Sequence, residues 1–430
     1  MASIVSADRI RFLLNRLHER LWVRPLAVCL LSIAVAFIAK LADGTQLQTL
    51  APDISPGSIE TLLSVMASSM LVIATFSVGS MVSAYASAAN IATPRSFPLI
   101  VADDASQNAL STFVGAFIFS IVALTAVKNE YFGTAGLFVL FVLTAIVFAM
   151  VITTFVRWVD RIARLGRLGS TIDKIEKATA TALTRQRHAP TLCGMPVQSE
   201  PGGRAVFAVS VGYVQHIDVA ALQSWAKEAQ VRVRVAILPG AFASPDQALA
   251  YVISDAGDQS EIDYDCVVKA FQIGCDRLFS DDPRFGLVVL SQIAGRALSP
   301  AVNDPGTAID IIGTLVRLFT LWSEAEVDED TLIYDRVEVP EVSVREMFDD
   351  GFTAIGRDGA GLVEVSVRLQ KALHSLALMG DAEMREAAVY HGRLALKRAQ
   401  IALDISEDVS AVRDAAKFAE SAVASDSQQA

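Results

Sequence analysis

Four charge-free apolar windows constrain what this chain can fold into. They cover residues 26–39, 61–94, 105–127 and 131–156. A helix needs about 20 apolar residues to cross a bilayer core, so the last three windows are long enough by themselves. The first is extended by its flanks, because Trp22 suits the interface and Arg24 and Lys40 can reach outward to water. The sequence therefore predicts four transmembrane helices, at about 22–42, 61–90, 107–127 and 134–156.

The overall composition also indicates a membrane protein. Of the 430 residues 53% are hydrophobic and only 19% are charged, and the mean hydropathy is +0.43, too apolar for an ordinary soluble protein of this length. A cleaved secretory signal is the competing interpretation of the first window, which has the length of a signal's hydrophobic core. A retained helix is favoured, because the preceding segment is long for a signal and further apolar windows follow.

Basic residues predict the orientation in the membrane. Five arginines precede the first window and eight lysines and arginines follow the fourth within 157–187, whereas 40–60 carries one lysine and three acids. The positive-inside rule then places both termini in the cytoplasm. The basic collar at 157–187 suits anionic lipid headgroups. The net charge of −11 leaves no basic face for nucleic acid.

Beyond the membrane part the hydrophobic period changes. Residues 204–260 are predicted to form a small mixed α/β module, because Val231, Val233 and Val235 alternate with arginines as in a half-buried strand and Asp218 can cap the helix that follows it. A further strand is expected at 249–253. Residues 261–405 have a helical period and 406–430 are expected to be frayed or disordered. The expected helices lie near 263–276, 283–298, 305–323, 342–356, 362–378 and 381–404. The predicted fold class is a four-helix membrane domain, assigned to 1–187, joined to a mostly helical α+β cytoplasmic domain.

The stretch RALSPAVNDPGTA at 296–308 concentrates turn-forming residues. Asp304 followed by Pro305 is a helix start, as is Asp282 followed by Pro283, so a helix–turn–helix corner accounts for Ser299, Asn303 and Asp304. Arg296 on an otherwise apolar helix is expected to be buried against helix-end carbonyls and Asp304. The alternative is an anion site formed by Arg296 and the N–H groups beside Pro305.

Several segments together resemble a known bacterial family. They are GYVQHID at 212–218, GAFASPDQALAYV at 240–252 and DPRFGLVVLSQIAGRALSPAVNDPGTAID at 282–310, together with the four apolar windows. The chain resembles the predicted membrane proteins called domain of unknown function 2254, to about residue 400. Ala241 and Asp246 replace an acid and a glycine of the family pattern, which weakens any local ligand role. The resemblance implies a location in a bacterial inner membrane, and it implies no activity.

Catalytic and metal signatures receive little support. His216, Asp218 and Ser210 are the residue types of a hydrolase triad, but no nucleophile-elbow motif accompanies them. Asp281, Asp282 and Asp304 could hold a divalent ion, although solvated caps explain them better. The four cysteines include no CxxC pair, so neither a disulfide frame nor a zinc site is indicated. No cofactor or metal is predicted, and an enzyme is not supported.

The second window carries the clearest functional hint. Its 34 uncharged residues would be about 50 Å long as a helix, longer than the bilayer core. At 100° per residue one face collects Ser68, Thr75, Gly79, Ser83 and Asn90. Such a face permits close helix packing or lines a water-filled path. No acidic or basic side chain lies deep in any of the four windows, so neither a proton relay nor an ion-coupled pump is indicated.

Two classes of function follow. The first is a homo-oligomeric passive channel for ions or small solutes, with the second helix lining the pore and the cytoplasmic domain as its gate. The second is a membrane-anchored sensor or scaffold that binds a partner or a small anion without conduction. The expected partners are the lipid bilayer and further copies of the same chain.

Overall fold

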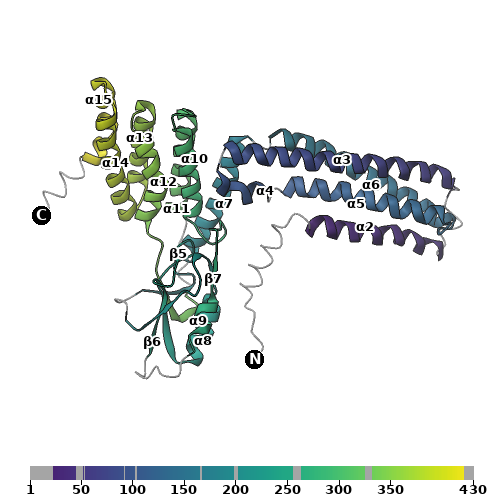
Figure 1. Cartoon of the computed structure of the whole chain (residues 1–430), viewed down its shortest axis with the longest axis horizontal. Helices are drawn as coiled ribbons and strands as arrows, with labels where there is room; N and C mark the ends of the chain where they lie inside the picture. The colour runs from purple at the N-terminus through teal and green to yellow at the C-terminus, as the bar shows by residue number, and fades with distance from the viewer. Residues whose placement is uncertain are drawn as a thin grey trace. The chain divides into compact units, whose positions relative to one another are not determined.

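The computed structural model describes residues 23–44, 52, 54–91, 93–101, 104–164, 167–197, 202–254, 263–324 and 332–420. Two compact units divide between Thr171 and Ile172, whereas the sequence placed this division at 187. The structure confirms the predicted fold class, because one unit is a bundle of long apolar helices and the other is a mostly helical unit with two sheets (Figure 1).

Among the described residues, four helices of the bundle are long and apolar enough to cross a membrane. These are α2 (Val23–Leu41), α3 (Pro56–Ile91), α5 (Asp104–Lys128) and α6 (Thr134–Arg164). Between α3 and α5 lie a 3-10 turn, Pro94–Ser96, and the short helix α4 (Phe97–Val101). The α6 helix continues eight residues beyond its predicted end at 156, because arginines end an apolar window but favour helix.

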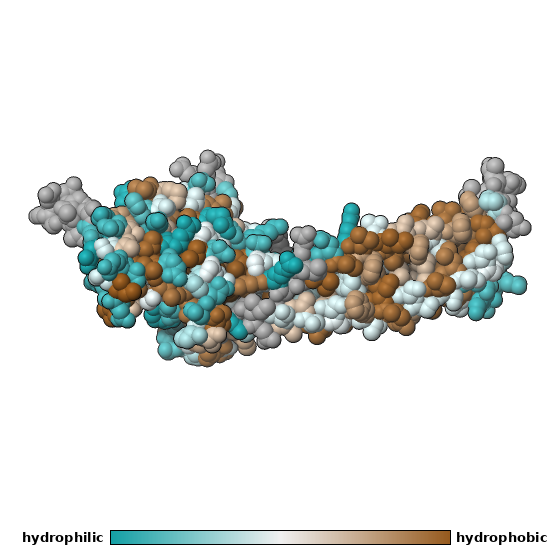
Figure 2. Space-filling view, turned by 90° about the horizontal axis from the view of Figure 1, so that it is seen from above, coloured by the Kyte–Doolittle hydropathy of each residue, from teal (hydrophilic) through white to brown (hydrophobic). Residues whose placement is uncertain are grey.

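The α5 helix packs against α2, α3 and α6. Phe113 and Phe119 of α5 are fully buried, as are Leu63 of α3 and Leu140 of α6. The outer surface is apolar too: Leu31, Val72 and Phe76 are more than 60% exposed, and brown surface dominates the visible face of the bundle in Figure 2. A helix bundle with apolar residues both inside and outside is suited to lipid.

The second unit begins with α7 (Leu168–His188), of which the residues from Ile172 onward belong to it. Its larger sheet has the order β1-β8-β4-β6-β2, and its smaller antiparallel sheet has the order β5-β3-β7. The strands of the larger sheet are β1 (Gly194–Pro196), β2 (Arg204–Phe207), β4 (Val231–Val235), β6 (Ala248–Ser254) and β8 (Tyr334–Val339). Those of the smaller sheet are β3 (Gly212–Ile217), β5 (Phe242–Ala243) and β7 (Phe271–Gly274).

Two strands of the larger sheet come from outside the predicted 204–260 module. The β1 strand lies between the predicted membrane domain and this module, and β8 lies in the region that was expected to be helical. The β8 strand pairs in parallel with β1 and with β4. The β8 strand lies beside β4, with Val337 opposite Val233. The prediction that β4 exposes its arginines is wrong for Arg234, which is buried and donates to Glu338 of β8 at 2.7 Å. The partner carboxylate was far away in sequence.

The remaining helices are α8 (Val219–Glu228), α9 (Asp265–Ala270), α10 (Phe285–Ala297), α11 (Pro305–Glu324), α12 (Val344–Asp358), α13 (Val363–Met379), α14 (Ala382–Ala402) and α15 (Ser406–Ala415). The expected helix at 263–276 is shorter, because Phe271–Gly274 pairs with β3 instead. The expected frayed tail contains α15, where Val412 and Ala416 are fully buried against the α14 residues Leu396 and Ala399. Residues 421–430 lie outside the described part.

Candidate functional site

The predicted polar face of α3 lies on the outside of the bundle. Ser68, Thr75, Gly79 and Ser83 are exposed, and a Cβ added at Gly79 would meet no atom within 4 Å. On the opposite side of the same helix the residues are buried: Leu63, Met66, Met70, Ala74, Ser77 and Met81. The small and hydroxylated positions therefore face away from the core of the bundle. Asn90 belongs to α3, but its side chain is outside the described residues.

The hydroxyl groups of this face bond within the helix. Ser68 Oγ donates to the carbonyl of Ser64 at 2.7 Å, and Thr75 Oγ1 donates to that of Leu71 at 2.9 Å. Each hydroxyl proton is thus satisfied without water, while the oxygen can still accept. The geometry is compatible with lipid, with another helix or with a water-filled path.

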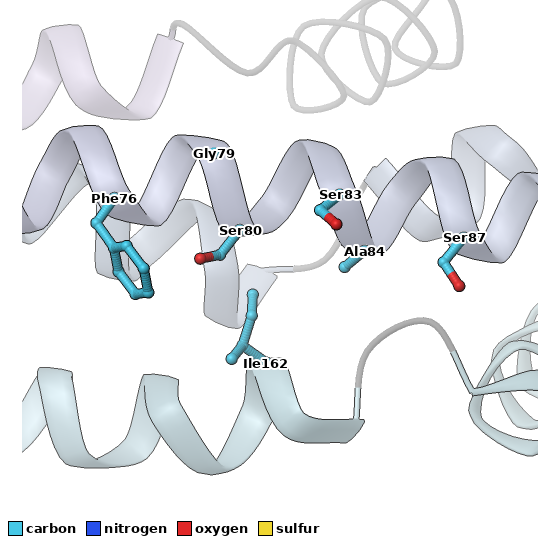
Figure 3. Close-up of a pocket in the computed structure, with 7 residues that line it drawn as sticks. All are labelled: Phe76, Gly79, Ser80, Ser83, Ala84, Ser87 and Ile162. Atoms are coloured by element: carbon cyan, nitrogen blue, oxygen red, sulfur yellow. The ribbon is translucent and has the colours of Figure 1, made fainter.

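Beside this face, an open groove of about 510 Å³ lies between α3 and α6. Phe76, Ser80 and Ser83 line it from α3 and Ile162 from α6 (Figure 3). Phe76 also contacts the Trp158 ring edge to face, with ring centroids 6.2 Å apart. The groove combines serine hydroxyls with an apolar wall on the outer side of the bundle.

The RALSPAVNDP block forms the corner between α10 and α11. Asn303 has φ +50°, and its N–H donates to the Ser299 carbonyl at 2.9 Å. Asp304 caps α11 by accepting from the Thr307 N–H at 3.1 Å and from the Thr307 hydroxyl at 2.6 Å. These bonds hold the pKa of Asp304 below its usual value, the hydroxyl of Thr307 contributing most. The predicted cap at Asp304 is thus present.

The environment of Arg296 differs from the one predicted for it. Its side chain is exposed, not buried, because it projects from the solvent side of α10 while Ile293 and Ala297 face the core. The argument for a desolvated cation in need of an acceptor therefore fails. The alternative anion site at this corner stays a prediction.

A cluster that the sequence reasoning missed surrounds the Asp281–Asp282 turn. His216 Nδ1 of β3 lies 2.7 Å from Asp281 Oδ2, and Arg185 Nη1 of α7 lies 3.0 Å from the other Asp281 oxygen. Asp282 is buried and accepts two bonds from Arg277, at 2.6 and 3.0 Å. Asp282 also accepts from the N–H of Phe285 at 3.0 Å, so it caps α10, which begins two residues later than predicted.

Gly240 explains why two of the quoted motifs meet at this turn. It has φ +91°, and an added Cβ would lie 2.2 Å from Asp282 Oδ2, so only glycine lets the 240–252 segment approach the carboxylate. Two residues after Asp282, Arg284 bonds Asp350 of α12 at 2.6 Å and also contacts Glu346. Burial raises the pKa of Asp350 although Arg284 opposes the shift. The sequence did offer one hint of this cluster, because Gly240 and Asp282 both lie in segments that resemble the family.

The structure also places the residues named in the catalytic and metal hypotheses. The carboxylate that contacts His216 is Asp281, whereas Asp218 accepts from the Ala221 N–H and caps α8. Asp281 and Asp282 each contact arginines of the chain itself, and Asp304 lies at the far end of α10. Within the described ranges no group of three or more His, Cys, Asp or Glu residues is arranged to hold a metal.

Taken together, the four membrane-length helices among the described residues and the mixed α+β unit indicate a membrane protein with a second, largely helical unit. The family model of predicted membrane proteins with domain of unknown function 2254 matches residues 18–375. The chain belongs to this family.

Curated relatives are uncharacterized proteins of Mycobacterium tuberculosis and Mycobacterium bovis. Each is 23% identical over 335 residues, covering 75% of this chain. The chain spans 64% of the length of these relatives. No solved structure gives a significant match.

Proposed function

We propose that the protein is a homo-oligomeric passive channel in which the exposed face of α3 lines the path. The observation that supports this proposal is the position of Ser68, Thr75, Gly79 and Ser83 on the side of α3 opposite its buried face. Around a central axis, copies of this face would provide hydroxyl oxygens and bare backbone to water. Its lack of charge suits passive flux better than ion-coupled transport.

A membrane-anchored sensor or scaffold is the second candidate. It is favoured by the bonds of Ser68 and Thr75 to their own helix, which let the same face pack on a second helix with no water between them. In that case α3 joins copies of the protein, and the second unit binds a partner or a small anion.

Flux through liposomes separates the two candidates. The matched pair is Ser68→Leu and Ser69→Leu: both residues are exposed serines of α3, but consecutive residues point about 100° apart. In a channel, Ser68→Leu and Ser83→Leu reduce the ion flux at least several-fold, because leucine fills and dries the path, while Ser69→Leu leaves it close to wild type. Absence of flux from the wild type under every gradient would overturn the channel and leave the scaffold.

Both candidates require more than one copy. We expect a homo-oligomeric mass in mild detergent and in nanodiscs, measured by light scattering or native mass spectrometry. A strictly monomeric mass in both media contradicts both proposed arrangements of α3.

Flux that responds equally to Ser68→Leu and Ser69→Leu would mean that a different surface conducts.

A further inference from the structure

The α7 helix follows the last membrane-length helix after a very short connection. Arg164 ends α6 and Leu168 begins α7, and four extended peptide steps reach about 14 Å. If α6 crosses the bilayer, chain connectivity alone starts α7 close to the lipid headgroups. The question is which side of α7 could meet them.

One side of α7 is fixed inside its own unit. Ile175, Thr179 and Leu183 are buried, and Thr179 lies so close to α10 that a Cβ on Gly286 would be 1.7 Å from its hydroxyl oxygen. Glu176 pairs with Arg317 of α11 through two bonds, at 2.6 and 2.7 Å. These contacts determine which residues of α7 are left on its outer side.

The outer side forms an open hollow of about 460 Å³. Every residue lining it belongs to α7: Lys177, Ala180, Thr181, Thr184, Arg185 and His188. Spacings of three and four residues place these side chains in one row along the helix. Lys177 and Arg185 are exposed, and Arg185 also contacts Asp281. Asp173 lies one turn before Lys177. The residues that line the hollow include two positively charged side chains, Lys177 and Arg185, and no acidic one, although the chain as a whole carries −11.

We propose that this outer row of α7 docks on the phosphate groups of anionic phospholipids. The chemistry is complementary, because lysine and arginine donate charge-assisted bonds to phosphate oxygens, and basic residues next to a membrane helix are attracted to an anionic leaflet. Its place directly after α6 favours a headgroup over a freely diffusing phosphate. The docking does not depend on conduction, so either proposal can fail without the other.

The test uses the full-length protein in neutral detergent. Phosphatidylglycerol is titrated while the melting temperature is followed, with phosphatidylcholine and inorganic phosphate as parallel arms. Lys177→Glu should move the titration midpoint to at least about fivefold higher lipid, since one basic residue near an anionic surface contributes about 1 kcal/mol. Lys371→Glu is the matched control, because it makes the same charge change at an exposed position of α13.

The outcomes are distinct. A titration midpoint at higher phosphatidylglycerol concentration for Lys177→Glu alone, with the midpoint of Lys177→Arg close to that of the wild type, supports docking by charge. Equal midpoints for Lys177→Glu, Lys371→Glu and the wild type overturn it. A melting-temperature rise with inorganic phosphate as large as that with phosphatidylglycerol would show a free-anion site and overturn the lipid assignment.

Discussion

Asp304 and Arg296 belong to the same corner but should respond differently to alanine. Asp304→Ala removes the cap of α11 and should cost about 1 kcal/mol in the free energy of unfolding, because two bonds to Thr307 are lost. Arg296→Ala should stay within about 0.5 kcal/mol, as surface substitutions do. Thermal unfolding of both variants measures the difference. A loss for Arg296→Ala as large as that for Asp304→Ala would contradict this expected difference.

His391 is the residue that should make the second unit sensitive to acid. Its ring is buried between α12 and α14, with Nε2 3.0 Å from Asp349. Burial lowers the pKa of His391 to about 4, with Arg345 and Arg398 acting in the same direction and Asp349 opposing them. Between about pH 6.5 and pH 4 the unfolded chain therefore binds the proton first. Stability is fully present above that range and falls as the pH decreases through it.

The pH dependence can be assigned by substitution. His391→Gln should flatten the decrease in melting temperature between pH 6.5 and pH 4, because the titrating group is gone. His374→Gln is the control, since His374 is exposed and stacks on Phe418. Identical acid profiles for His391→Gln and the wild type would assign the acid sensitivity to other groups.

At the scale of elements, the start of α6 depends on a carboxylate from the 3-10 turn Ala42–Gly44, which follows α2. Asp43 accepts from the N–H groups of Gly133 and Gly136, at 2.8 and 2.6 Å. This is a helix cap supplied from about 90 residues away in sequence. Asp43→Ala should lower the free energy of unfolding by about 1–2 kcal/mol and loosen the connection between α2 and α6.

Glycine substitutions test the same contact from the other side. A Cβ at Gly136 would lie 2.8 Å from Asp43 Oδ1, whereas one at Gly169 in α7 would meet nothing within 4 Å. Gly136→Ala should therefore lower the melting temperature, and Gly169→Ala should leave or raise it through helix propensity. Equal effects of the two changes would argue against a tight contact at Asp43.

At the scale of the whole molecule, the charge pattern predicts the topology. If each of the four membrane-length helices found among the described residues crosses the bilayer, the number of crossings is even. Basic residues are concentrated before the first of these helices and after the last. Reporter fusions at positions 45, 100, 130 and 200 should read outside, inside, outside and inside. An outside signal at position 200 contradicts the four-crossing arrangement with cytoplasmic termini.

The sequence by itself determined the features that depend on local composition. Four membrane-length helices follow from apolar length, and the caps at Asp218 and Asp304 follow from residue type next to a helix start. The tertiary structure alone decided which distant segments meet. It placed β8 beside β4, so that Glu338 neutralises a buried Arg234, and it brought His216 to Asp281. Periodicity reports which side of an element is apolar, but pairing between segments 65 or 104 residues apart leaves no local signal.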